Sequence, residues 1–416
     1  MKTRLYLRAA LALSAGAIPL LADNTAVLPF SNVSTESSGA IRNPANMDWI
    51  GESIAETLRA AFAARGVLTL ERDRTTEAYQ RLHLRERTEL TEASMLKVGE
   101  VLDAEQVVHG TFSFVPAAAG TSNSTSKGSL KIQARVSDRR RLKQSAAFEE
   151  TGAIEDLATL ESHLAWRALT VVAPARAPAE SEFRSLRTAV PLDVLENYIR
   201  GLLAAAPEQK EKYFTQAARL DPDYSPPAFE LGKIHFERKD YREAAAWLEH
   251  VGPTENHYRE ASFFLGFSRY QAGDFEAARK AFQTIAEKVP ISTVWNNLGA
   301  AESRLNLPQA IETFRKALDQ DPSDPDYHFN LGYALFKKGD FAAAADRFRA
   351  VLDRNPEDQM ATLLLGRCLK KQGLRAATAS DARLQALERL KDTYEERVYF
   401  QLKSILESPS PSEPRQ

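Results

Sequence analysis

The sequence predicts a two-part α+β protein, in which a small α/β sandwich domain is followed by an all-α superhelix. Three observations support this fold class. Strand-like and helix-like apolar segments alternate over residues 23–172. A Leu-Gly pair then recurs at a nearly fixed spacing over residues 191–372, and such a period is typical of stacked helical hairpins. Between the two parts, residues 173–190 contain Pro174 and Pro178 and are expected to form a linker.

Composition limits the class of function. The chain has 416 residues, of which 44% are hydrophobic, so it can bury more than one core. Its 54 basic and 56 acidic residues leave a formal net charge of −2, so no nucleic-acid partner is expected. The sequence has no phosphate-binding glycine loop, no His-Glu-x-x-His motif and a single cysteine, Cys368. We therefore expect neither a cofactor nor a metal.

The start of the chain, residues 1–22, is expected to be a secretory signal peptide. Lys2, Arg4 and Arg8 precede an apolar run over residues 9–22, and Asp23 ends that run. A basic start followed by a short apolar core is typical of export signals. The sequence thus predicts a periplasmic or otherwise exported protein that is cleaved after Ala22.

Residues 24–172 predict the order β-α-β-α-β-β-β-α. Four of the five strands are expected at residues 25–30, 67–70, 107–115 and 130–136. In the last of these strands, apolar and polar residues alternate, so one face of the strand is expected to be exposed to solvent. Four apolar residues at helical spacing predict a helix that ends at a glycine; they are Ile50, Ile54, Leu58 and Phe62, followed by Gly66. A closing helix is expected over residues 154–172.

Four stretches of this domain together resemble the amino-terminal domain of TolB, which is related to FlgO and CsgG. They are AVLPF, WIGESIAETLRAAFAARGVLTLERDR, GEVLDAEQVVHGTFSF and LKIQARVSD, and the resemblance covers about residues 24–172. The resemblance implies a place in the bacterial periplasm or at the outer membrane, and a role in protein association. It leaves peripheral association with the outer membrane open. The chain has no propeller-like sequence, so the role of TolB itself is not implied.

Columns of packing residues mark the repeats. The glycines of the Leu-Gly pairs recur at a nearly constant interval, as the units of a helical repeat array do; they are Gly232, Gly266, Gly299, Gly332 and Gly366. In the first four units a bulky residue follows, namely Leu248, Phe282, Phe314 and Phe348. We interpret each glycine as a point of close helix approach and each bulky side chain as the group that fills the space beside it. This pattern resembles the tetratricopeptide repeat family over residues 191–372. The resemblance implies that a protein or peptide is bound in a groove.

The end of the chain is expected to cap the array. Residues 373–406 are predicted to form capping helices, because their apolar residues follow a helical stripe. The stripe consists of Leu384, Leu387, Tyr394, Val398 and Ile405. Such a cap keeps the end of a repeat array soluble. The prolines at 409, 411 and 414 predict a disordered tail over residues 407–416.

An aromatic stripe is the candidate binding site. Phe263, Phe267 and Tyr270 fall at positions i, i+4 and i+7 of one helix, and a second trio repeats this spacing. In the tetratricopeptide family the corresponding helix face lines the groove. The candidate partner-binding residues are Phe229, Phe236, Phe263, Phe267, Tyr270, Asn297, Arg304, Phe329, Asn330, Tyr333, Phe336 and Lys337. Alternatively, the aromatics pack between neighbouring helices. Asn297 and Asn330 also resemble the asparagines with which family members hold a terminal carboxylate.

The sequence therefore predicts a non-enzymatic, exported scaffold that binds a protein or peptide in the groove of its repeats. One alternative is a structural component of a cell-envelope secretion or motility assembly, in which the α/β domain self-associates; whether the chain forms a homo-oligomer is left open. A remote third hypothesis is a hydrolase that uses Ser94 and Lys97, which match the Ser-x-x-Lys pattern of penicillin-recognising enzymes. That pattern lacks its Lys-Thr-Gly and Ser-Asp-Asn partners here, so no catalytic residue is expected.

The export signal gives a first prediction. Arginine in place of both Leu13 and Leu20 interrupts the apolar run, so the precursor should remain in the cytoplasm. Cell fractionation measures this, with the unaltered chain as the control. N-terminal sequencing that found intact Met1 in the periplasmic fraction would count against cleavage after Ala22.

Overall fold

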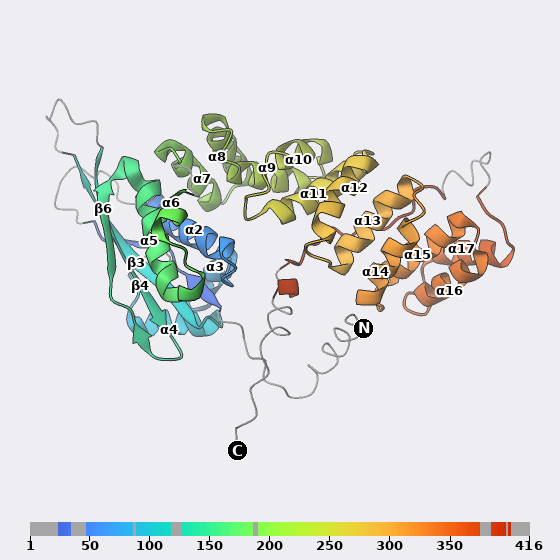
Figure 1. Cartoon of the computed structure of the whole chain (residues 1–416), viewed down its shortest axis with the longest axis horizontal. Helices are drawn as coiled ribbons and strands as arrows, with labels where there is room; N and C mark the ends of the chain where they lie inside the picture. The colour runs from blue at the N-terminus through green and yellow to red at the C-terminus, as the bar shows by residue number, and fades with distance from the viewer. Residues whose placement is uncertain are drawn as a thin grey trace, which may run out of the picture. The chain divides into compact units, whose positions relative to one another are not determined.

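The computed structural model describes residues 24–34, 47–85, 89–117, 127–185, 190–374, 384–396 and 398–400. The chain divides into an N-terminal unit over residues 21–228 and a C-terminal unit that starts at Phe229. A small sheet region is followed by a long run of helices, which confirms the predicted fold class (Figure 1). The predicted signal peptide, 1–22, and the predicted tail, 407–416, lie outside the described residues.

The sheet of the N-terminal unit is organised around two long antiparallel strands. These are β3 (Gln106–Pro116) and β4 (Gly128–Asp138), which pair from Gln106↔Asp138 to Pro116↔Gly128. β1 (Thr25–Val27) and β2 (Ser31–Asn32) run parallel to β3, while β5 (Lys143–Gln144) and β6 (Phe148–Ala153) run antiparallel to β4. On β4 the side chains of Leu130, Ile132 and Ala134 are buried. Lys131 and Arg135, on the other face of the strand, are exposed, as the alternation predicts.

Helices of this unit follow the predicted periodicity. They are α2 (Trp49–Ala64), α3 (Arg72–Arg81), α4 (Glu92–Val101) and α5 (Leu157–Val172), the last preceded by the 3-10 turn η3 (Ile154–Asp156). α2 buries the whole predicted stripe and packs against α5. The strand predicted at residues 67–70 is reduced to one bridge between Thr25 and Thr69. Its pairing ends there because α3 begins at Arg72.

The predicted linker, residues 173–190, is partly folded. It contains the 3-10 turn η4 (Pro174–Arg176) and the helix α6 (Glu180–Ser185). The indole N–H of Trp166, on α5, donates to the carbonyl of Pro178 over 3.0 Å, and Phe183 is buried. The linker therefore packs on α5. The same unit also holds the first helical hairpin, formed by α7 (Leu192–Leu203) and α8 (Pro207–Leu220).

The C-terminal unit is a series of helical hairpins. Its helices are α9 (Pro226–Glu237), which begins at the unit boundary, α10 (Tyr241–Leu248), α11 (Tyr258–Gln271), α12 (Phe275–Ala286), α13 (Ser292–Arg304), α14 (Ala310–Gln320), α15 (Pro325–Lys338), α16 (Phe341–Leu352) and α17 (Gln359–Leu369). α11 packs on α12, α13 on α14 and α15 on α16, and each hairpin contacts the next. Gly339 ends α15 with a φ of 88°, a left-handed conformation that glycine adopts without strain.

The glycine columns are points of close approach, as predicted. A Cβ atom added to Gly299 would lie 2.7 Å from the ring of Phe314, and one added to Gly266 would lie 2.9 Å from Phe282. Both rings are fully buried. Gly366 on α17 differs, because an added Cβ would meet nothing within 4 Å. Within the described residues, α17 has no second helix that would supply the corresponding ring.

The capping helices predicted over residues 373–406 are wrong for most of the described part. Residues 384–395 form no helix, and helical residues appear only at 396 and 398–400. The reason is that side chains of the repeats bind the main-chain N–H and C=O groups of Arg389 and Lys391. Those groups are then not available for the i→i−4 bonds of a helix. Residues 401–406 lie outside the described part of the chain.

The glycine columns give a second prediction. Gly299→Ala should destabilise the protein by about 1–3 kcal/mol, because the added methyl overpacks the buried ring of Phe314. Gly366→Ala is the matched control at the same repeat position. It should be neutral or stabilise by up to about 1 kcal/mol, because alanine favours the helix and meets no neighbour. Urea unfolding measures both, and equal stabilisation by the two substitutions would contradict the packing argument.

Candidate peptide-binding face

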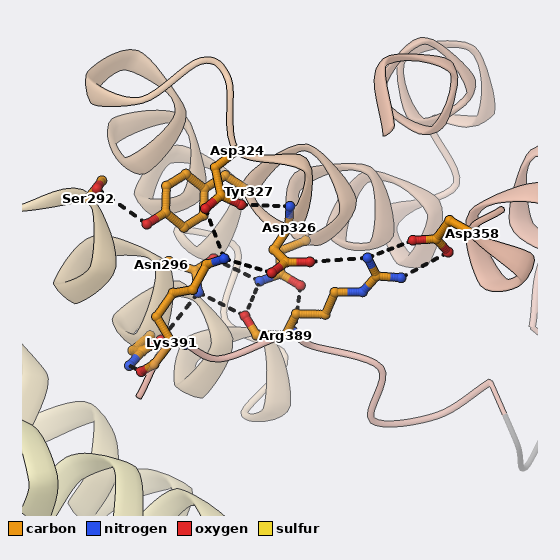
Figure 2. A network of polar contacts seen from close by, with 10 residues as sticks. Ser292, Asn296, Asp324, Asp326, Tyr327, Asp358, Arg389 and Lys391 are labelled. Carbon is orange, nitrogen blue, oxygen red and sulfur yellow. Dashed lines mark hydrogen bonds and ion pairs between the residues drawn. The ribbon is translucent and has the colours of Figure 1, made fainter. Parts of the chain in front are cut away.

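An extended stretch of the chain lies along the helices of the C-terminal unit. We call residues 384–396 the C-terminal segment. The surface that contacts it, made by side chains of α11, α13 and α15 and by the capping residues Asp324 and Asp358, is called the segment-binding face. Figure 2 shows the centre of this contact, where Arg389 and Lys391 point toward three aspartates.

Two asparagines bind the main chain of the segment. The Asn330 side-chain amide donates to the Arg389 carbonyl over 2.7 Å and accepts from the Arg389 N–H over 2.8 Å. Asn297 makes the same pair of bonds with Lys391, at 2.7 and 2.9 Å. Both asparagine residues are fully buried. Because an amide offers a donor and an acceptor side by side, each asparagine satisfies both polar groups of one extended residue.

The spacing of the two asparagines matches the geometry of an extended chain. Asn297 and Asn330 hold equivalent positions on successive repeats, whereas the residues they bind, Lys391 and Arg389, are separated by a single residue. Residues i and i+2 of an extended chain face the same side. Each successive repeat therefore binds a residue two positions farther along the extended chain. Asn296 links the two sites, since it donates to the Arg389 carbonyl over 2.8 Å and accepts from Asn330 over 2.7 Å.

Arg389 lies between two carboxylates and above an aromatic ring. Its guanidinium approaches Asp326 at 3.1 Å and Asp358 at 2.8 and 3.0 Å, a two-point contact. The guanidinium carbon lies 3.6 Å from the centre of the Phe329 ring. Asp358 also caps α17, accepting from the Ala361 N–H over 2.9 Å. Burial works against the charge of Asp358, but Arg389 and this backbone bond outweigh it and lower the pKa of the carboxyl.

Lys391 completes the same cluster from the other side of Asp326. Its ammonium group lies 2.8 Å from Asp324 and 2.7 Å from Asp326 (Figure 2). Burial opposes the ammonium charge, yet the two carboxylates outweigh it and raise the pKa of Lys391. Asp324 is the N-cap of α15, where it accepts from the Asp326 N–H over 2.8 Å. The aspartates that begin α15 and α17 are thus both helix caps and ligands for cations.

Glu388 faces the opposite side and is the most deeply buried charge of the segment. Its side chain accepts hydrogen bonds from Ser303 at 2.7 Å and from the Tyr270 hydroxyl at 3.5 Å. The Lys337 ammonium group lies 3.7 Å away. Burial lowers the pKa of Lys337, and Glu388 acts in the opposite direction. A buried carboxylate with these partners is satisfied, whereas loss of a partner would leave an uncompensated charge.

The ends of the segment are held by further contacts. The Tyr333 hydroxyl donates to the Leu384 carbonyl over 2.7 Å. At the other end the Tyr394 ring stacks on Phe263, with ring centres 5.1 Å apart, and Glu396 pairs with Arg259. Contacts with one segment therefore come from α11, α13, α15 and the start of α17.

The structure divides the twelve candidate residues into two groups. Seven contact the segment: Phe263, Tyr270, Asn297, Phe329, Asn330, Tyr333 and Lys337. The others pack mainly among helices: Phe229 against His257, Phe236 against Phe267, Phe336 against Phe341, and Arg304 over Phe275. Packing between helices therefore accounts for part of the set, and contact with the chain's own segment accounts for the rest. A role in binding a partner stays a prediction for all twelve.

Sequence reasoning missed the residues that bind the cations of the segment, Asp324, Asp326 and Asp358. Asp324 and Asp358 are N-caps and Asp326 lies in the first turn of α15. An aspartate at either kind of position is already explained by the helix terminus, so the pattern gave no separate signal. It also missed Asn296. In the structure Asn297 and Asn330 hold main-chain groups within the segment, and their resemblance to a terminal-carboxylate clamp stays a prediction.

The other candidate sites have ordinary structural partners. Ser94 bonds to Thr91 at the N-cap of α4, while Lys97 pairs with Glu100. Cys368 is buried, which raises the pKa of its thiol to about 11. Across the described residues, no three metal-ligating side chains cluster. No helix in the described part of the chain combines the length and apolar character needed to cross a bilayer.

Comparisons with known families identify the repeats. Models described as TPR repeat or tetratricopeptide repeat match residues 260–290, 306–339 and 329–394. The chain therefore carries tetratricopeptide repeats, as predicted. The last match runs into the C-terminal segment, although that stretch is extended. These matches do not include residues 24–172, so the resemblance to TolB, FlgO and CsgG stays a prediction. None of the curated proteins matches the chain.

Several solved structures are similar to part of the chain. YrrB, described as a TPR protein with an unusual peptide-binding site, is 18% identical over 42% of this chain and 92% of its own, with a TM-score of 0.38. MamA from Desulfovibrio magneticus RS-1 is 24% identical over 38% and 92%, with a TM-score of 0.35. The Yersinia enterocolitica type III secretion chaperone SycD, solved with a YopD peptide, is 22% identical over 29% and 100%, with a TM-score of 0.27.

The asparagine contacts give a third prediction. Asn297→Ala combined with Asn330→Ala removes the side chains that bind Arg389 and Lys391, so amide exchange in residues 384–396 should become faster. Each lost bond costs about 0.5–1.5 kcal/mol of local stability. Hydrogen exchange with mass spectrometry measures this.

Asn197→Ala is the matched control for this experiment. Asn197 lies on α7 in the N-terminal unit, and its side chain donates to the Asp193 carbonyl. Exchange in residues 384–396 should keep the rate of the unaltered chain in this variant. Unchanged protection in the double variant would show that the asparagines do not hold the segment.

Proposed function

We propose that this chain is a non-enzymatic protein-interaction scaffold whose segment-binding face holds an extended stretch of a partner protein. The observation that carries the proposal is the pair of two-point bonds from Asn297 and Asn330 to the main chain of one extended segment. Main-chain bonds of this kind do not depend on the bound sequence, so the same face can hold another chain in the same conformation. Tetratricopeptide repeats are typically protein-interaction modules, which supports this proposal.

The negative charges of the segment-binding face also support the proposal that it binds a basic ligand. Asp324, Asp326 and Asp358 lie close enough to share two cations, which the C-terminal segment supplies as Arg389 and Lys391. Carboxylates grouped in this way repel one another when no cation is bound. A bound chain with two basic residues at positions i and i+2 relieves that repulsion. The face therefore selects a basic extended chain.

We further propose that the scaffold is exported and works in the cell envelope. The basic start and the apolar run over residues 9–22 support export. The resemblance of residues 24–172 to TolB, FlgO and CsgG supports a role in protein association there. The N-terminal unit would then locate or assemble the scaffold, while the repeats bind the partner.

Selection of displayed random peptides on the purified full chain tests the binding function and is our fourth prediction. The target is the full-length Arg389→Ala, Lys391→Ala variant, in which the ion pairs of the chain's own segment are removed. Selected peptides should bind this variant and lose about ten-fold or more in affinity when Asn297→Ala and Asn330→Ala are added, because about 1.4 kcal/mol of hydrogen bonding corresponds to a factor of ten.

Asn197→Ala in the same background is the control and should leave peptide affinity unchanged. If the peptides bind equally well with and without Asn297 and Asn330, the segment-binding face is not the site. Peptides that bind residues 24–172 instead would favour the alternative of a structural component of an envelope assembly.

A further inference from the structure

We propose that the C-terminal segment is a tethered ligand of its own repeats, and that the partner is an extended peptide with the same pattern. That pattern is Glu-Arg-apolar-Lys, with an aromatic residue three positions after the lysine, as in Glu388 to Tyr394. The partner must displace the segment in order to bind. This inference rests on the proposed function, because it assigns a sequence pattern and a competitor to the same face.

The helical core has packing of its own beneath the segment, although Leu384 is buried in the same core and Leu387 and Leu390 pack against it. Phe282, Phe314 and Phe348 fill the spaces beside the glycine columns and are fully buried among the helices themselves. The segment also receives hydrogen bonds to its main chain and ion pairs to its side chains, which are the contacts that recognise an extended peptide. The side chains of Arg389 and Lys391 also stay 27% and 23% exposed, so water and a competing chain can reach them.

One side of the segment defines the basic positions of the pattern. Arg389 makes a two-point contact with Asp358, approaches Asp326 and covers the ring of Phe329. A planar guanidinium fits two carboxylate oxygens and an aromatic face at once, and an ammonium group does not. The first basic position therefore requires arginine. The second, held by Lys391 between two carboxylates, requires a positive charge.

The other side defines the acidic and apolar positions. Glu388 is bonded by Ser303 and approached by Lys337. Ala386, Glu388 and Leu390 border one cavity of about 360 Å³, whose wall includes Phe267 and Arg304. These three positions alternate with Arg389 and Lys391, as the two faces of an extended chain do. A partner therefore needs an acid directly before the arginine and an apolar residue directly after it.

Backbone strain makes the segment an imperfect ligand. Ala386 has a φ of 65°, in the left-handed region that residues with a Cβ atom rarely adopt. Glycine adopts this conformation without that cost. A peptide with glycine at the position of Ala386 should therefore bind more tightly than the segment sequence itself. The chain holds a ligand that a better-adapted partner can replace.

Fluorescence anisotropy with two labelled peptides tests this inference and is our fifth prediction. One peptide has the sequence of residues 384–396, and the other carries Ala386→Gly. The protein is the full chain, either unaltered or with Glu388→Ala, Arg389→Ala and Lys391→Ala. Both peptides should bind the altered chain at least about ten-fold more tightly than the unaltered chain, because a tethered competitor acts at an effective concentration of the order of millimolar.

The glycine peptide should bind several-fold more tightly than the alanine peptide, because it relieves the strain at this position. A control peptide with Arg389→Glu places a negative charge beside two carboxylates and should not bind measurably. If the altered chain keeps the melting temperature of the unaltered chain but binds neither peptide, the inference is wrong. Equal binding of the Arg389→Glu peptide would overturn it too.

If the altered chain fails to fold, hydrogen exchange in the unaltered chain tests whether a peptide displaces the C-terminal segment. Excess glycine peptide, made with heavy isotopes so that its fragments differ in mass, should increase exchange in residues 384–396 of the protein. Protection that persists at saturating peptide would overturn the inference. The peptide selection separates this inference from the proposed function. Selected peptides that depend on Asn297 and Asn330 but lack the Arg-x-Lys pattern would disprove the inference. The proposed function would still stand in that case.

Discussion

The C-terminal unit depends on the fact that a carboxamide side chain can donate and accept a hydrogen bond at the same time. Asn297 and Asn330, buried on successive repeats, each use both groups on one residue of an extended chain. Buried polar groups without partners are costly, so these asparagines require a main chain, or an equivalent set of donors and acceptors, against them. The extended, non-helical course of the chain at Arg389 and Lys391 follows from this requirement. The aspartates then pair with the side chains of these two residues.

Much of the fold could be predicted from the sequence because it depends on periodic packing. The Leu-Gly pairs indicated the repeats, and the structure places Gly299 against Phe314 as the columns imply. The stripe on α2 and the alternation on β4 are likewise local patterns that burial follows directly. In contrast, the strand expected at residues 67–70 is a single bridge, because pairing depends on where the next helix begins.

The site was predicted only in part, for a physical reason. The apolar stripe of residues 373–406 has helical spacing, and local pattern cannot reveal that asparagines on much earlier helices compete for the same amides. Asp358 resembles an ordinary helix cap, and Asp326 an ordinary first-turn acid, until Arg389 is placed between them. The aromatic stripe was informative because Phe263, Phe329 and Tyr333 do contact the segment. Phe236 and Phe336 show that the same spacing also serves packing between helices.

The segment also changes the mechanics of the array. Repeat proteins are quasi-one-dimensional, since each unit touches only its neighbours and can loosen with limited effect on units farther away. Here one strand of chain contacts α11 through Glu396, α13 and α15 through Arg389 and Lys391, and the start of α17 through Arg389. It joins α11, α13, α15 and the start of α17 through one continuous stretch of chain, in addition to the contacts that neighbouring hairpins make with each other. Release of the segment would therefore soften this part of the superhelix along its axis, so that occupancy of one binding face sets the elasticity of several repeats.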